Sequence, residues 1–135
     1  MRLWHEQLIP YLPRQQLLGQ HRECCALRGK GWGKPHATVN YIFNHSPYRL
    51  FLYHREIMME MDKRGYRHDP LWDDPYYRGK NSPNHTEASL YQKETKLKIS
   101  FPIYPEHNKS YLAECLANLH SKGVELPACL SSPNE

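Results

Sequence analysis

The sequence predicts a mainly α-helical fold, a compact single domain with long loops. Apolar side chains recur at the spacing of amphipathic helices in three segments, 13–28, 47–63 and 109–122, and a glycine follows within two residues of each. The connecting segments are rich in Gly, Pro, Asp and Tyr, as loops are. With 135 residues, the chain can bury a core as one domain. We expect that domain over 1–126 and a loose tail over 127–135.

The first predicted helix runs from Pro13 to Arg28. Proline suits an early helical position, and the glycine that follows Arg28 suits a stop. Apolar side chains lie along one face at helical spacing. The opposite, polar face carries Gln16, Gln20 and Glu23.

The other two long helices have similar signals. Ser46 can cap the helix over 47–63, and its lysine and arginine before Gly65 favour an end there. Its expected buried stripe is Leu50, His54, Ile57, Met58 and Met61. The expected stripe of the last helix is Leu112, Cys115, Leu116 and Leu119.

The remaining segments are less regular. Residues 1–12 form an irregular start, and 66–83 form a loop. Residues 38–43 are either a strand or a lead-in to the next helix. A capping pattern from Asn84 to Glu87 predicts a short helix over 85–95. The alternation of polar and apolar residues over 96–103 is typical of a strand.

A mild positive charge and many aromatic rings favour a polyanionic partner. The chain has 18 Lys and Arg against 14 Asp and Glu, a net charge of +4, and ten Tyr. Rings beside basic groups suit base stacking and phosphate contact, and ordinary polar-aromatic packing gives the same composition.

Other kinds of site are disfavoured. The four cysteines form no Cys-x-x-Cys pair, and the nine histidines show no metal-ligand spacing, so we expect no metal site and reduced thiols in a cytoplasm. No apolar stretch approaches membrane-spanning length, and the first residues lack the apolar core of a signal sequence.

Gly19 and Glu23 are candidates for chemistry on the first helix. Helical side chains lean toward the N-terminus, so Glu23 lies over the turn that contains Gly19. A missing side chain there either opens room for a nucleotide or lets another backbone pack closely. Arg22 points away from Glu23, toward a phosphate or toward solvent.

The loop Gly29–Lys34 reads Gly-Lys-Gly-Trp-Gly-Lys. It lacks the spacing and the final Ser or Thr of a P-loop, which excludes nucleoside triphosphate binding by that motif. Lys30, Trp32 and Lys34 either contact DNA, through phosphates and a stacked base, or form a tight surface turn around a packed Trp.

Several segments together resemble the phage endonuclease V family of pyrimidine-dimer DNA glycosylases. Their shared order over residues 1 to 95 carries the resemblance. They are Met1-Arg-Leu, Leu17-Leu-Gly-Gln-His-Arg-Glu23, His36-Ala-Thr, Lys63-Arg-Gly65, Tyr77-Arg-Gly79, Pro83 and Glu87-Ala-Ser89.

The resemblance implies an endonuclease V-like fold and cofactor-free glycosylase and abasic-site lyase chemistry on damaged double-stranded DNA. The amine of Met1 would attack the sugar C1′, Glu23 would be the catalytic carboxylate, and β-elimination would break the strand. We expect a cytoplasmic monomer, associated with the nucleoid in a prokaryote. The expected DNA contacts are Arg2, Gln15, Arg22, Arg28, Lys30, Trp32, Lys34, His36, Arg78 and Lys80.

The sequence departs from the family pattern in three places. Position 26 is Ala where the family has Arg, and Arg28 is the candidate replacement. Arg2 blocks removal of the initiator methionine, so Met1 itself would supply the amine. The C-terminal helix over 109–122 is an addition to the family fold.

The proposed nucleophile agrees with elementary chemistry. An α-amine has a pKa of about 7.7–8.0, well below that of lysine, so a useful fraction is neutral at physiological pH. A catalytically silent DNA- or RNA-binding module on the same scaffold, or an unrelated interaction protein with a basic surface, is the alternative. Borohydride trapping on abasic DNA separates the enzyme from both.

Overall fold

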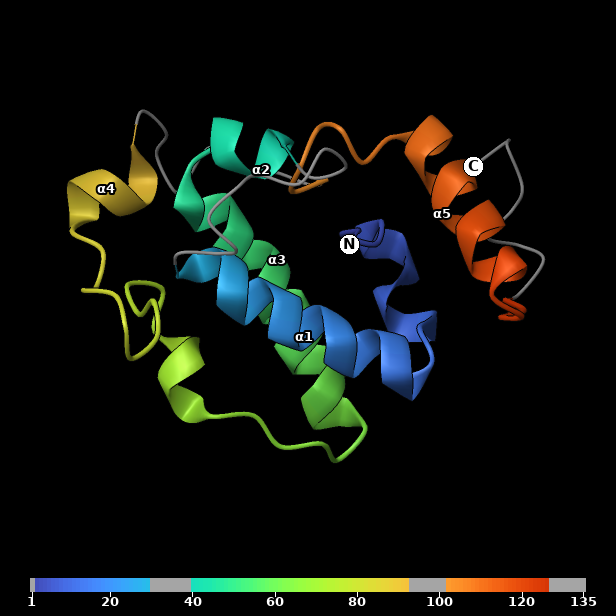
Figure 1. The fold of residues 1–135 in the computed structure, drawn as a ribbon, viewed down its shortest axis with the longest axis horizontal. Helices are drawn as coiled ribbons and strands as arrows, with labels where there is room; N and C mark the ends of the chain where they lie inside the picture. The colour runs from blue at the N-terminus through green and yellow to red at the C-terminus, as the bar shows by residue number, and fades with distance from the viewer. Residues whose placement is uncertain (1, 30–39, 93–101, 127–135) are drawn as a thin grey trace.

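Helices make up all the regular structure in residues 2–29, 40–92 and 102–126, which are the residues that the computed structural model describes (Figure 1). This confirms the prediction of a mainly α-helical fold. In chain order the elements are η1 (Glu6–Tyr11), α1 (Arg14–Arg28), α2 (Tyr41–Asn44), α3 (Pro47–Lys63), η3 (Pro70–Asp73), α4 (Glu87–Tyr91) and α5 (Lys109–Ser121), where η marks a 3-10 helix.

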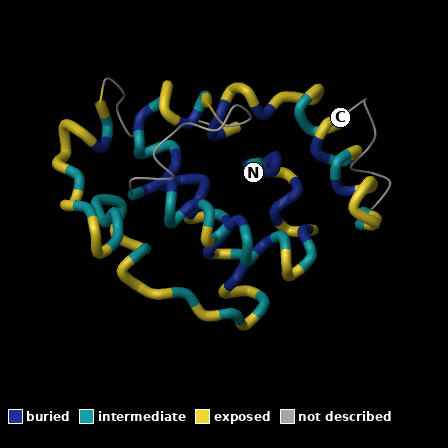
Figure 2. Tube along the Cα trace, viewed as in Figure 1, coloured by how far each residue is buried: buried dark blue, intermediate teal, exposed yellow. Residues whose placement is uncertain are grey.

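Helices α1 and α3 lie side by side at the centre of the molecule, and η1, α2 and α4 pack against α3. The buried part of the chain follows these two helices and the N-terminal segment, whereas the segment from 66 to 92 runs along the periphery (Figure 2). The expected stripe of α3 is buried throughout, which confirms His54 as a core residue. Apolar side chains from other elements are fully buried with it, among them Leu3, Leu8, Leu17 and Leu119.

Local signals set the ends of the long helices. Helix α3 begins at Pro47 after Ser46, and Gly65 follows it with φ +81°, a conformation that favours glycine. Helix α1 ends before Gly29, where a Cβ atom would lie 2.9 Å from the carbonyl oxygen of Arg78. Glycine is needed there because another backbone approaches closely.

The first twelve residues are more regular than expected. The His5 side chain accepts a hydrogen bond from the Gln7 N–H and starts η1, which the sequence pattern did not predict because Pro10 lies inside it. The last helix, α5, begins after Asn108, whose side chain accepts from the N–H of Tyr111. The N-terminal segment lies between α1 and α5 (Figure 1).

Three predictions between 38 and 103 can be compared with the structure. The start of α2 shows that the 38–43 segment leads into a helix, as far as it is described from residue 40. Residues 93–95 of the helix predicted over 85–95 lie outside the described residues, and its described part is α4. That helix begins at Glu87 because Thr86 and Ser89 cap each other, in place of the expected Asn84 and Glu87. Most of the strand predicted over 96–103 lies outside the described residues, and Pro102 and Ile103 are not in a strand.

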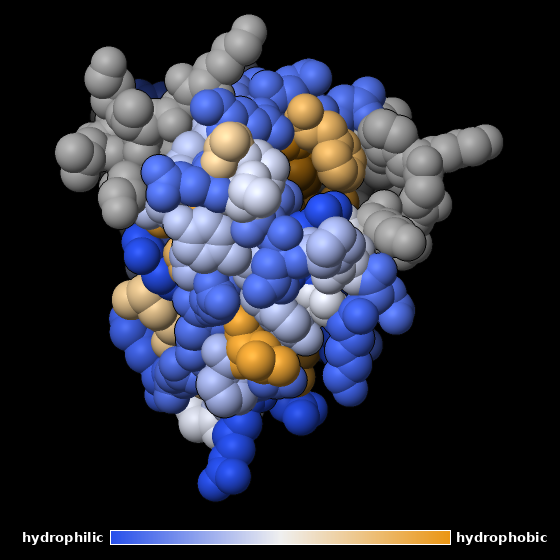
Figure 3. Space-filling model, turned by 90° about the vertical axis from the view of Figure 1, so that its left-hand side faces the viewer, coloured by the Kyte–Doolittle hydropathy of each residue, from blue (hydrophilic) through white to orange (hydrophobic). Residues whose placement is uncertain are grey.

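The surface that includes α4 and η3 is mostly hydrophilic, with separate small hydrophobic areas (Figure 3). Leu71 and Phe43 are about half exposed. None of the helices in the described part of the chain has the length and apolar composition that a membrane crossing requires.

Candidate active site

Gln20 lies at the centre of a buried hydrogen-bond network. The sequence pattern placed it on the polar face of α1, but its side chain is 0% exposed. Its amide oxygen accepts from the N–H of Trp4 at 2.7 Å, and the hydroxyl of Tyr53 lies 2.9 Å from the same oxygen. Its amide nitrogen donates to the carbonyl of Arg2 at 3.0 Å and to Glu23 Oε1 at 2.9 Å. Gln20 is buried, although it is on the polar face of α1, because the N-terminal segment covers that face.

This network brings the start of the chain to Glu23. The two hydrogens of one amide group bind the Arg2 carbonyl oxygen and the Glu23 carboxylate, so these two oxygens cannot be farther apart than the sum of the two hydrogen-bond lengths. Because the amide oxygen must face a backbone N–H, the orientation of the Gln20 amide is fixed. Met1, the expected nucleophile, lies outside the described residues.

The Glu23 carboxyl is half-buried and is well suited to exchange protons. Burial raises its pKa, and the hydrogen bond from Gln20 and the charge of Arg22 oppose that rise. Among the described residues, Gln20 donates the only hydrogen bond to this carboxylate. A carboxyl with a raised pKa and free acceptor capacity is typical of catalytic acids and bases.

Gly19 leaves space on the same side of α1. A Cβ atom at Gly19 would meet, among the described residues, only the guanidinium of Arg22, at 3.8 Å. Of the two interpretations of this glycine, room for a ligand therefore agrees with the structure, and close packing of another backbone does not.

The expected DNA contacts that the structure describes fall into two groups. Gln15 and Arg22 are exposed on α1, on one face with Gly19, because residues seven apart align on a helix. The guanidinium of Arg2 lies over the ring of Tyr111, 5.7 Å from its centroid, and 3.4 Å from a carboxylate oxygen of Glu114. Arg2 is linked to Glu23 because the carbonyl of Arg2 and the carboxylate of Glu23 bind the same Gln20 amide.

Arg28 and Arg78 belong to the second group, at the C-terminal end of α1. Arg28 is 5% exposed and turned about 140° around the helix from Glu23. Its guanidinium donates to the carbonyl oxygens of Trp72, Asp74 and Tyr77 at 2.8, 2.7 and 3.0 Å. This corrects the expectation that Arg28 contacts DNA directly, because its donors already bind backbone carbonyls inside the protein.

Arg78 donates to the carbonyl oxygens of Arg28 and Gly29 at 3.1 and 3.2 Å, and Lys80 is exposed. The other expected contacts lie outside the described residues: Lys30, Trp32, Lys34 and His36.

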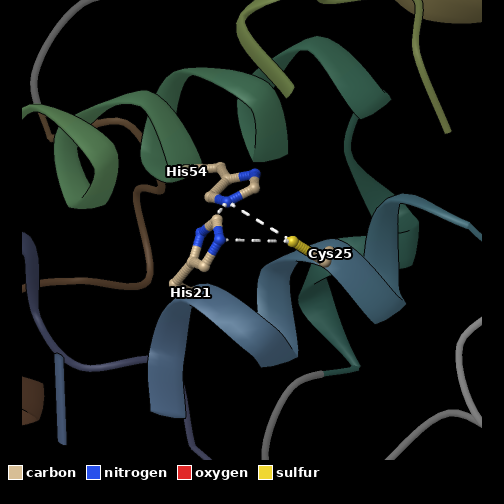
Figure 4. A group of neighbouring side chains, drawn as sticks. All are labelled: His21, Cys25 and His54. Carbon is tan, nitrogen blue, oxygen red and sulfur yellow. Dashed lines mark hydrogen bonds between the residues drawn. The ribbon is translucent and has the colours of Figure 1, made fainter. Parts of the chain in front are cut away.

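A cluster of His21, Cys25 and His54 was missed by the sequence reasoning (Figure 4). Their candidate metal-ligand atoms lie within 4.8 Å of one another. The signal was the i, i+4 spacing of His21 and Cys25, which puts both on one face of α1.

The hydrogen bonds of this cluster compete with metal binding. Arg28 can only donate, so the contact of 3.0 Å from its Nη1 makes His54 Nδ1 the acceptor. Burial holds the pKa of His54 well below its ordinary value, so the ring is neutral and its proton is on Nε2. That Nε2–H donates to His21 Nδ1 at 2.8 Å, and His21 Nε2 lies 3.8 Å from the Cys25 sulfur. A metal at His54 Nε2 would have to displace this proton.

Comparison with known proteins identifies the family. The sequence model of the family described as pyrimidine dimer DNA glycosylase matches residues 1–74, which is more than half of the chain and includes Gln20 and Glu23. No curated protein and no solved structure matches the chain. The match confirms the resemblance drawn from the sequence, and the chain belongs to the pyrimidine dimer DNA glycosylase family.

Proposed function

We propose that this protein is a DNA glycosylase with abasic-site lyase activity on damaged duplex DNA, with pyrimidine dimers or related lesions as substrates. The N-terminal amine of Met1 is the nucleophile, and Glu23 is the catalytic carboxylate. No cofactor takes part. The observation that supports this most directly is the shared Gln20 amide, which binds both the Arg2 backbone and the Glu23 carboxylate.

In the first step, the neutral amine attacks C1′ while the N-glycosidic bond breaks. The bonding electron pair leaves with the base, which takes up a proton, and the amine nitrogen loses one. The C1′–O4′ bond then opens, O4′ takes a proton, and a protonated imine joins Met1 to C1′. Glu23, with its raised pKa, gives and takes protons and stabilises positive charge on the sugar.

In the second step, the imine acidifies the C2′ hydrogen. A base removes that proton, the electron pair forms the C2′–C3′ double bond, and the bond from C3′ to its phosphate oxygen breaks. Water then hydrolyses the imine and frees the enzyme. An enzyme that acts on a duplex must also expose its target, by flipping a nucleotide or kinking the DNA.

Blocking the N-terminus tests this mechanism. Acetylation, or residues added before Met1, should eliminate the borohydride-trapped adduct with abasic DNA, since an amide nitrogen has no available lone pair. Binding to undamaged duplex should fall only modestly, because one charge among several phosphate contacts is lost.

Lysine variants identify the nucleophile if the protein with a blocked N-terminus still forms the borohydride-trapped adduct with abasic DNA. Loss of trapping in Lys30→Ala or Lys34→Ala would move the nucleophile to that lysine and keep the enzyme class. If the native protein forms no adduct, the lyase proposal fails, and a binding module on the same scaffold becomes the better account.

A further inference from the structure

Helix α5 holds the N-terminal segment from the side opposite α1, although it lies beyond the residues that the family match covers. The Tyr111 hydroxyl donates to the carbonyl oxygen of Leu3 at 2.5 Å. The same ring lies under the guanidinium of Arg2, and Glu114 is within ion-pair distance of that group. Two residues of α5 therefore contact residues 2 and 3, more than a hundred positions away in sequence.

Side chains from three helices bind the backbone of residues 2–4. Gln20 of α1 donates to the Arg2 carbonyl, Tyr111 of α5 to the Leu3 carbonyl, and Tyr53 of α3 to the Trp4 carbonyl. No helix or sheet supplies partners for this segment, so these side chains satisfy backbone groups that would otherwise be buried without hydrogen bonds. The Leu3 and Trp4 side chains, at 0% and 6% exposure, anchor the segment in the core.

The three hydrogen bonds restrict how far the amine can move. Peptide groups are planar, so binding the Arg2 and Leu3 carbonyls fixes two successive peptide planes. Only three rotatable backbone bonds, ψ and φ of Arg2 and ψ of Met1, then separate the fixed planes from the amine. Because the Gln20 amide also binds Glu23, the amine is tied to the carboxylate through the same side chain.

Tyr111 is itself held in place. Its ring stacks on that of His107 with centroids 4.8 Å apart, and the Asn108 side chain accepts from its N–H at the start of α5. Burial raises the pKa of the Tyr111 hydroxyl, which therefore keeps the proton that it donates to Leu3.

We propose that Tyr111 is a positioning residue for the nucleophile. Helix α5 completes the active site by holding the N-terminal amine at a fixed position relative to the Glu23 carboxylate. This inference rests on the proposed function, because it assumes that the amine reacts. In this role Tyr111 acts through the Leu3 carbonyl that its hydroxyl binds, and not by taking part in the reaction itself.

Tyr111→Phe in the full chain tests this role, because it removes the hydroxyl and keeps the stacked ring. Trapping is measured on an abasic duplex in single turnover, with saturating enzyme in excess, so that a smaller folded fraction does not change the rate constant. We expect the rate constant to fall about tenfold, since small displacements of reacting groups have large effects on rate. Affinity for a duplex with a tetrahydrofuran abasic analogue should stay within about twofold of the wild type, because no phosphate contact is lost.

Leu119→Ala is the matched control. It removes a fully buried side chain of the same helix that makes no hydrogen bond to residues 2–4, so it should lower the melting temperature and leave the rate constant unchanged. Equal rate constants for Tyr111→Phe and the wild type, or equal losses in Tyr111→Phe and Leu119→Ala, would overturn the assignment of Tyr111 while the proposed function stands.

Amide hydrogen exchange gives a readout that needs no activity. In Tyr111→Phe, the Trp4 amide, which donates to Gln20, should exchange several times faster, whereas the Tyr53 amide in the middle of α3 should not change. An unchanged exchange rate at the Trp4 amide would contradict the proposal that Tyr111 holds the N-terminal segment in place. A wild-type protein that forms no adduct would remove the proposed function, and the positioning role with it, even if exchange at Trp4 increases.

Discussion

Two polar clusters lie on α1, and they are built differently. Glu23 and His21 point about 160° apart around the helix, each toward a different edge of the contact with α3. On the first edge, Gln20 and Tyr53 bind the N-terminal backbone. Burial raises the pKa of Glu23, whose carboxylate accepts no hydrogen bond from the described residues other than that from Gln20. On the second edge, His21 and His54 form a chain in which both imidazoles use both nitrogens.

We interpret the first edge as the candidate active site and the second edge as part of the structural core. Buried polar groups stabilise a protein when all their hydrogen bonds are made, and the His21–Cys25–His54 cluster with Arg28 meets that condition among the described residues. Within the described residues Glu23 accepts one hydrogen bond, from Gln20, which leaves acceptor capacity on the carboxylate. We therefore expect substitutions on the first edge to affect catalysis and those on the second edge to affect stability.

The largest expected effect is that of Glu23→Gln. Strand cleavage of abasic DNA should fall at least about 10²-fold, since proton transfer by a positioned carboxyl contributes that much or more. DNA binding should be kept, because losing a negative charge beside a phosphate backbone does not weaken it. Glu6→Gln is the matched control, since Glu6 is also half-buried with a pKa raised by burial but binds the Ile103 N–H instead. Wild-type cleavage by Glu23→Gln, or equal losses in both variants, would place the catalytic carboxylate elsewhere.

Arg28→Met should be the most destabilising substitution on the second edge. It leaves three backbone carbonyls and His54 without their donor, so the free energy of unfolding should fall by about 3 kcal/mol in urea denaturation. Arg22→Met, an exposed position on the same helix, should change it by less than about 0.5 kcal/mol. The salt dependence of DNA binding should show the reverse order, with a smaller slope for Arg22→Met and the wild-type slope for Arg28→Met. A smaller salt dependence of DNA binding in Arg28→Met than in the wild type would show that Arg28 contacts a phosphate after all.

The long helices could be predicted because their signals are local. Helix α1 lies between Pro13 and Gly29, and helix α3 lies between Pro47 and Gly65. The observed ends of both helices are within a residue or two of the expected ends. Glu23 could be singled out for the same reason, since Gly19 lies one turn before it.

The burial of Gln20 and Arg28 could not be predicted because their partners are distant in sequence. Gln20 is polar by composition, and only the crossing of residues 2–4 and the approach of Tyr53 make it a core residue. Arg28 binds carbonyls 44 to 49 residues away, in a loop whose path no local pattern specifies. Tyr111 is a stronger case, because its partner lies 108 residues earlier.

The second edge should also make stability depend on pH. The pKa of His54 is held well below 6.5 by burial, with the charges of Arg28, His21 and His68 adding to the shift. A histidine with a depressed folded pKa stabilises the protein above the unfolded pKa of about 6.5, and that stability is lost as pH falls. From pH 7.5 to 5.5, we expect His54 to account for a loss on the order of 1 kcal/mol in unfolding free energy.

His54→Asn isolates this contribution, because the asparagine oxygen can still accept from Arg28 and the side chain does not titrate. His68, whose pKa is raised through Asp73 and Asp62 against the effect of burial, acts in the opposite direction in both proteins and cancels in the difference. Parallel stability curves for the wild type and His54→Asn between pH 7.5 and 5.5 would mean that folding does not lower the pKa of His54.

The smallest expected effect is that of zinc on the second edge. The three candidate ligand atoms of His21, Cys25 and His54 lie within 4.8 Å of one another, a spacing that could hold a metal ion. Zinc would, however, have to displace the His54 proton that is donated to His21, and it would place a dication beside the buried Arg28. We therefore expect 100 μM zinc to change the melting temperature by less than about 1 °C, whereas a site with a Kd of about 1 μM would add about 2.7 kcal/mol and raise it by several degrees. Cys25→Ala and Cys115→Ala separate this cluster from other thiols. A zinc-induced rise that Cys25→Ala abolishes and Cys115→Ala keeps would show that the Arg28 contact yields to the metal, and the second edge would then be a site rather than a scaffold.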